Sequence, residues 1–156
     1  MTTISSIIWQ PFLIAEPTPA SLDDVTAWEK EFGYTLPKDF SEYARAHQGC
    51  IPELEDLEAH KKTSLDCISG MFHFDRSPEH RFSLLGNVGY IEEFRPGALV
   101  FVDWSGDFMA FDYGDDPHRK NPPIIYWDHE TKVVEKIAAS FTDLLQKCLD
   151  GGPLRG

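Results

Sequence analysis

Residues 98–113 read ALVFVDWSGDFMAFDY, and this stretch decides the fold. β-Branched and aromatic residues fill two runs, Ala98 to Trp104 and Phe108 to Tyr113, with Ser105-Gly106 between them. Two such runs around a short turn that contains glycine are typical of a β-hairpin. The stretch therefore predicts two antiparallel strands.

Two further runs extend this hairpin along the chain. The first is Ile124 to Trp127, which follows a polar loop that contains prolines. The second passes through Val133 and Val134, after a turn predicted at Asp128-His129-Glu130. Successive short strands joined by turns predict an antiparallel meander, here of at least four strands.

Helical patterns flank the meander. The hydroxyl of Ser21 can cap a first helix, whose apolar stripe has helical spacing and ends at Gly33. A second helix begins at Leu36-Pro37 and stops at Gln48-Gly49, and Ser140 caps a final one. Helices, then a meander, then a closing helix favour an α+β fold over a parallel α/β sheet.

The pattern predicts one domain over residues 21–150. Residues 1–20, which end in Glu16-Pro17-Thr18-Pro19, are expected to run extended over the surface as a lead-in, and residues 151–156 as a tail. At this length a single chain can bury one sizeable core without metal or disulfides.

Three segments between the helices and the meander are less regular. Glu53 to Glu58 holds four carboxylates among two leucines, which fits either a short surface helix or a loop. Ile68 to Phe74 predicts a short strand. Ser83 to Phe94 has apolar residues at helical intervals and predicts a helix despite two glycines.

The chain is strongly acidic. Its 156 residues include 14 Lys and Arg against 26 Asp and Glu, a formal net charge of −12. Such a field repels phosphate backbones and anionic lipids, so neither nucleic acid nor a membrane is an expected ligand. It attracts a basic protein partner, because opposite net charge speeds association. Acidity that serves only solubility is the alternative.

The cysteines and the apolar runs predict a cytoplasmic protein. Cys50, Cys67 and Cys148 are an odd set without a CxxC pair, which argues against a disulfide framework and a zinc site. The apolar patch from Ile7 to Ile14 is interrupted and lacks a preceding basic residue, unlike a signal peptide.

No known catalytic motif occurs, and we predict neither enzyme activity, nor a cofactor, nor a metal site. Asp103, Asp107 and Asp112 flank the hairpin, but their spacing is not that of a calcium loop, and strand alternation separates Asp112 from the other two. Asp115 to His118 and Asp128 to Glu130 pair carboxylates with imidazole, yet no nucleophile accompanies them.

Several short motifs follow one another along the chain. They are Trp28, Phe32-Gly33, Leu36 to Phe40, Gln48-Gly49, Phe101 to Phe108, Ile125 to Glu130 and Ala139 to Leu145. Over residues 20–150 this pattern resembles the SUKH superfamily, the Smi/Knr-like proteins. Two departures from the family pattern are Gln48, where asparagine is usual, and residues 53–81, which match nothing.

The resemblance implies an α+β fold and, in bacterial members, an immunity protein that neutralises a cognate polymorphic toxin, often a nuclease or a nucleic-acid deaminase. Other members are regulatory interaction proteins, so a regulatory scaffold is the alternative function, and a small enzyme is a third. A toxin that handles nucleic acid presents a basic groove, which an acidic protein can occupy.

We expect the partner to bind through aromatic and acidic residues near the hairpin, since aromatic anchors commonly dominate a protein contact. The acidic group Glu53, Glu55, Asp56 and Glu58 could add to the rim of this surface. The predicted partner-binding residues are Glu92, Glu93, Asp103, Trp104, Asp107, Asp112, Tyr113, Asp115, Asp116, Tyr126 and Trp127.

Overall fold

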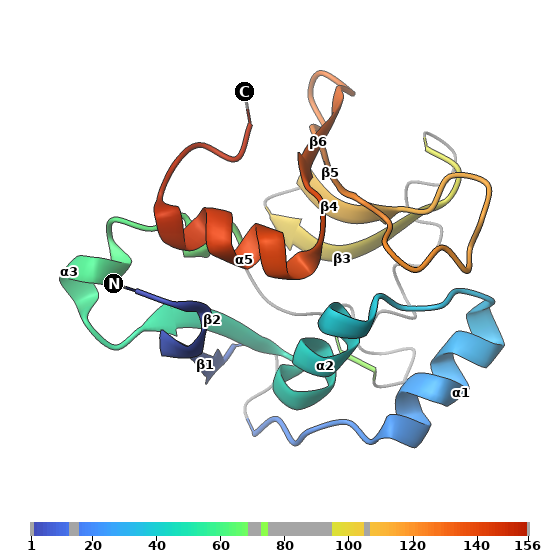
Figure 1. The fold of residues 1–156 in the computed structure, drawn as a ribbon, viewed down its shortest axis with the longest axis horizontal. Coiled ribbons are helices and arrows are strands. Elements are labelled where there is room, and N and C mark those ends of the chain that lie inside the picture. The colour runs from blue at the N-terminus through green and yellow to red at the C-terminus, as the bar shows by residue number, and fades with distance from the viewer. Residues whose placement is uncertain (1, 13–15, 69–72, 75–94, 105–106, 156) are drawn as a thin grey trace.

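A computed structural model of the chain describes residues 2–12, 16–68, 73–74, 95–104 and 107–155. Its largest element is a four-stranded antiparallel sheet in the order β3-β4-β5-β6. The strands are β3 (Ala98–Trp104), β4 (Asp107–Asp112), β5 (Ile124–Trp127) and β6 (Val134–Ala138). The meander predicted from the sequence is confirmed, and with the helices it makes an α+β domain (Figure 1).

The helices begin and end where their capping residues predict. In α1 (Leu22–Phe32) the Ser21 hydroxyl accepts a hydrogen bond from the Asp24 amide, and the Asp24 carboxylate accepts one from the Ser21 amide. The helix ends at Gly33, whose φ of 76° is a left-handed conformation that glycine adopts without strain. Ser140 caps α5 (Phe141–Asp150) through the Asp143 amide in the same way.

The core is centred on a cluster of four phenylalanine rings. Phe40 of α2 (Lys38–His47) has no exposed surface, and its ring lies 5.3 Å from Phe101, 4.9 Å from Phe111 and 5.3 Å from Phe141 between centroids. These rings come from α2, β3, β4 and α5. The cluster therefore joins the sheet to both helices, and removing one ring would cost about 3–5 kcal/mol.

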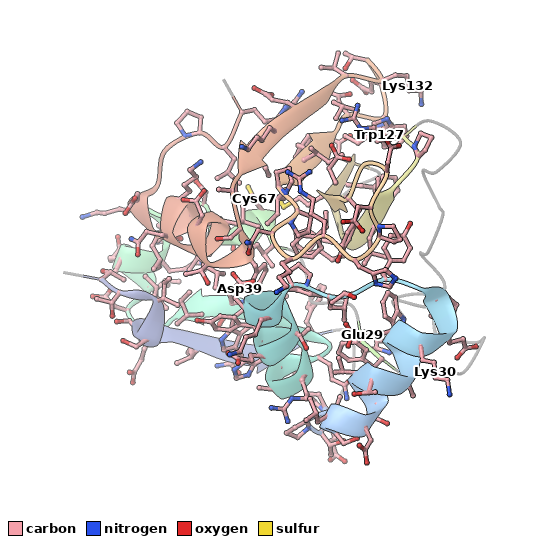
Figure 2. The ribbon with its side chains drawn as sticks, turned by 45° about the vertical axis from the view of Figure 1, so that its right-hand side comes forward. Glu29, Lys30, Asp39, Cys67, Trp127 and Lys132 are labelled. Atoms are coloured by element: carbon pink, nitrogen blue, oxygen red, sulfur yellow. The ribbon has the colours of Figure 1, made fainter. Side chains whose placement is uncertain are left out.

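A carboxylate also ties α2 to α5. The Asp39 side chain, labelled in Figure 2, accepts hydrogen bonds of 2.9 Å from both the amide and the hydroxyl of Thr142. Because these residues begin their helices, the contact holds the two N-terminal ends together.

A second sheet was not predicted. Strand β1 (Ile7–Pro11) pairs antiparallel with β2 (Cys50–Leu54), with Ile7 opposite Leu54. The segment that was expected to be a lead-in thus contains a strand, since its short apolar run finds a hydrogen-bonding partner far along the chain. In Figure 1 this pair lies across α5 from the larger sheet.

The segment Glu53 to Glu58 is divided between two elements. Its first residues complete β2, and after a short bend Asp56 caps the one-turn helix α3 (Leu57–His60) by accepting the amides of Glu58 and Ala59. Two short 3₁₀ turns, η1 (Ile4–Ser6) and η2 (Leu65–Cys67), complete the described elements.

Two predictions fall wholly or partly outside the described residues. The helix expected over Ser83 to Phe94 lies outside them. Of the strand expected over Ile68 to Phe74, Ile68 is not in a strand, His73 makes an isolated bridge, and residues 69–72 lie outside the described part.

Candidate functional site

The predicted partner-binding residues separate to the two ends of β4. Asp107 begins this strand and Asp112 ends it. At about 3.3 Å per residue these positions are roughly 17 Å apart. The two carboxylates therefore do not share one site.

A polar cluster surrounds Asp107 at the end of the sheet near the β3–β4 turn. Its carboxylate accepts hydrogen bonds from the Tyr126 hydroxyl, from the His129 amide at 2.9 Å and from the His129 ring. We call Asp107, Tyr126, Asp128, His129 and Arg155 the turn-end cluster.

Asp107 and His129 stabilise each other's charged forms. Burial alone would raise the pKa of Asp107, but the hydrogen bonds from Tyr126 and His129 hold that pKa below its usual value. The hydrogen bond to Asp107 raises the pKa of His129. Burial and then the same carboxylate raise the pKa of Tyr126. The arrangement favours an ionised Asp107 beside a protonated His129.

Both carboxylate oxygens of Asp128 accept hydrogen bonds from the protein. One carboxylate oxygen accepts the amides of Glu130 and Thr131, and these bonds keep its pKa low. The other oxygen lies 3.2 Å from the Arg155 guanidinium, which also packs over the Tyr126 ring at 4.5 Å. The segment predicted to be a tail therefore contacts the end of the sheet through Arg155, and no local sequence signal indicates this pairing.

Three atoms of this cluster are close enough to surround a cation. One ligand atom each from Asp107, Asp128 and His129 lies within 4.8 Å of the other two. Both carboxylates, however, already accept donors from the protein. We therefore infer that these side chains close the turn between β5 and β6, and that Asp128 also holds the C-terminal segment through Arg155.

The opposite end of β4 is also built from internal contacts. Asp112 forms an ion pair of 2.7 Å with Arg95. The ring of Tyr113 is buried, and its hydroxyl donates a hydrogen bond of 2.7 Å to the Thr35 carbonyl. Tyr113 thereby fastens the sheet to the link between α1 and α2, and its burial raises its pKa.

The remaining predicted residues differ in their exposure. Tyr126 and Trp127 are buried, and the Trp127 ring stacks on Phe108 at 5.3 Å and lies under the Lys132 ammonium at 4.8 Å (Figure 2). Asp115 and Asp116 are exposed. Glu92 and Glu93, and the side chains of Asp103 and Trp104, lie outside the described part.

A cleft at the start of α2 has a mixed lining. It has a volume of about 490 Å³ and lies between α2, the β4–β5 loop and Ser140. Lys38 and Lys120 contribute cations to its rim, beside the acidic Asp39 and Glu42. The cleft is therefore less suited to a basic partner than a purely acidic surface would be.

A model of the SMI1 / KNR4 family (SUKH-1) matches residues 19–147. The chain belongs to this family. The match covers every described element from α1 to β6 and most of α5, whereas β1 lies before it. The resemblance drawn from the sequence motifs is thus confirmed.

Membership in the SMI1 / KNR4 family supports a role of the immunity-protein type, and proteins of this family are generally not enzymes. Such a role implies a protein partner. No curated protein matches the chain. Within the described residues, every helix is too short or too polar to cross a bilayer.

Proposed function

We propose that this chain is a cytoplasmic immunity protein that binds a cognate toxin protein and neutralises it. The observation that carries the proposal is the family match over residues 19–147. The formal charge of −12 supports a basic toxin domain, such as a nuclease or a nucleic-acid deaminase, whose groove the acidic protein covers.

The chemistry of the folded chain is compatible with a binding role. Asp107, Asp128 and His129 combine carboxylates with imidazole, but these groups are engaged in closing a turn. Burial raises the pKa of the Cys148 thiol to about 12, so it is a poor nucleophile near neutral pH. Cys50, Cys67 and Cys148 are unpaired, as expected in a reducing cytoplasm.

Co-expression tests the proposal directly. Cells that produce a toxin domain encoded by a neighbouring gene should survive when the protein is present and die when it is absent. A Phe40→Ala variant is the control for folding, because it removes a ring from the core and should abolish protection. If the folded protein gives no protection and forms no complex with the toxin domain, a regulatory scaffold becomes the better interpretation.

A further inference from the structure

One face of the small sheet is partly exposed to solvent, since Ile8 and Gln10 are exposed, whereas Ile51 and Glu53 are half-buried. Ile7 and Leu54 lie opposite each other and are buried against the core, so their neighbours Ile8 and Glu53, which also lie opposite each other, point the other way. We define the β1–β2 face as Ile8, Gln10, Ile51 and Glu53, together with Phe12 and Glu55, which follow the two strands.

Apolar side chains are exposed along β1 and at the start of α3. Five large hydrophobic side chains are exposed in the described part of the chain, and three of them are Ile8, Phe12 and Leu57, which begins α3. Phe12 is 62% exposed, although its amide continues the strand pairing by donating to the Gly49 carbonyl at 3.1 Å. Phe12 and Leu57 lie toward opposite ends of the β1–β2 pair, with Ile8 between them. Ile8 and Phe12 are four residues apart on one side of the chain, a spacing that an extended protein segment can cover.

The surface beside Ile8 is hollowed. A depression of about 740 Å³ lies between η1, β1 and the start of α3, and Ile8 and Ala59 line it together with Glu55 and Asp56. A partner side chain that entered this depression would meet apolar groups and carboxylates at once.

The carboxylates of this face differ in their availability. Among the described residues, no hydrogen bond or ion pair engages the side chains of Glu53 and Glu55, whereas Asp56 caps α3 and Glu58 pairs with Lys61 at 3.1 Å. Glu53 and Glu55 can therefore accept donors from another molecule without breaking a contact within the described part of the chain.

We infer that the β1–β2 face is the surface that receives the partner, and that it takes a protein segment in which lysine or arginine alternates with apolar side chains. Apolar side chains of the segment would cover Ile8 and Phe12, while its cations would reach Glu53 and Glu55. The inference rests on the proposed function for the existence of a basic partner, and it adds where that partner binds.

A synthetic peptide in which lysine and leucine alternate is the probe for this surface. Its titration into the isotopically labelled full chain should shift the amide NMR signals of β1, β2 and the start of α3. The binding should weaken as salt is added, because exposed charge pairs are screened. A peptide of alternating glutamate and leucine should cause no such shifts.

Two matched double variants separate this face from the surface near the hairpin. Glu53→Lys with Glu55→Lys should weaken peptide binding by about tenfold or more, since the reversed charges repel the peptide. Asp115→Lys with Glu130→Lys makes the same charge change at two exposed positions, one near each end of β4, and should alter the affinity less than about threefold. An Ile8→Ser variant should weaken binding by about fivefold through lost apolar contact.

Equal weakening by both double variants, or shifts centred on Asp115 and Asp116, would overturn the inference. The proposed function fails separately, through the survival experiment. If the Glu53→Lys, Glu55→Lys protein stays folded and still protects cells as well as the unaltered protein, the immunity role stands and the assignment of this face is wrong.

Discussion

The turn-end cluster and the β1–β2 face both contain carboxylates, but they use them differently. At the turn, Asp107 and Asp128 accept donors from Tyr126, His129 and Arg155. On the β1–β2 face, Glu53 and Glu55 have no such bonds within the described residues. Net charge alone therefore does not indicate where a partner binds, because many acidic groups in this chain stabilise its own fold.

The contrast between the turn-end cluster and the β1–β2 face requires that β1 has one side against the core and one side toward solvent. The adjacent residues Ile7 and Ile8 give the strongest test of this. Ile7 is 8% exposed and Ile8 is 36% exposed. Ile7→Ala should lower the free energy of unfolding by about 3 kcal/mol, since it leaves a cavity in the core. Ile8→Ala should lower it by about 1 kcal/mol or less.

Urea denaturation of both variants measures the difference. Peptide binding should show the reverse order, with Ile8→Ala weakened and Ile7→Ala unchanged where it remains folded. Equal losses of stability would mean that β1 does not separate a core side from a solvent side.

A smaller loss of stability is expected at the turn-end cluster. Asp107→Ala removes the acceptor of the Tyr126 hydroxyl, whose residue is buried, and should destabilise the protein by about 2 kcal/mol. Glu55→Ala, on the β1–β2 face, should change stability by less than about 0.5 kcal/mol.

A double variant distinguishes hydrogen bonding from general disruption. In Asp107→Ala the loss of stability should come from the Tyr126 hydroxyl, which is left without its acceptor. The Asp107→Ala, Tyr126→Phe double variant removes both partners, so its loss of unfolding free energy should be smaller than the sum of the two single losses. Strict additivity in thermal or urea unfolding would contradict this account of the cluster.

The smallest expected effect is a dependence of stability on pH. The folded state raises the pKa of His129 above 6.5, through Asp107 first and then the nearby Glu130 and Asp128. The stabilisation from this group is therefore fully present below about pH 6.5, the ordinary histidine value, and is lost as the pH rises through the raised pKa.

Asp107 makes the stability of the fold depend on pH in the acidic range. Its pKa is lowered from 3.8, so its stabilisation is present above that value and is lost as the pH falls through the lowered pKa. NMR titration of the His129 ring tests the coupling, since Asp107→Asn should return the pKa of His129 toward 6.5. An unchanged histidine titration would show that Asp107 does not control this group.

Much of the fold was predictable from the sequence, but less of the candidate site was. The hairpin and meander followed from apolar runs separated by turn residues, and Trp28 was correctly assigned to the core by its place on a helical stripe. The aromatic anchors were harder to assign, because Tyr113, Tyr126 and Trp127 have the composition of an interface but are buried in the domain.

The sequence by itself determined the features that depend on neighbours a few residues apart. The pairs Ser21 with Asp24 and Ser140 with Asp143 cap helices across three residues, and Gly33 ends α1 through its own backbone freedom. Such contacts form within one turn of chain, so their residue types and spacing are sufficient to predict them.

Only the tertiary structure decided which distant segments meet. β1 pairs with β2 from some forty residues further on, Tyr113 bonds to Thr35 across 78 positions, and Asp39 reaches Thr142 across 103. These contacts form because the packed core brings the segments together, and that packing also decides which carboxylates are bonded within the described part of the chain.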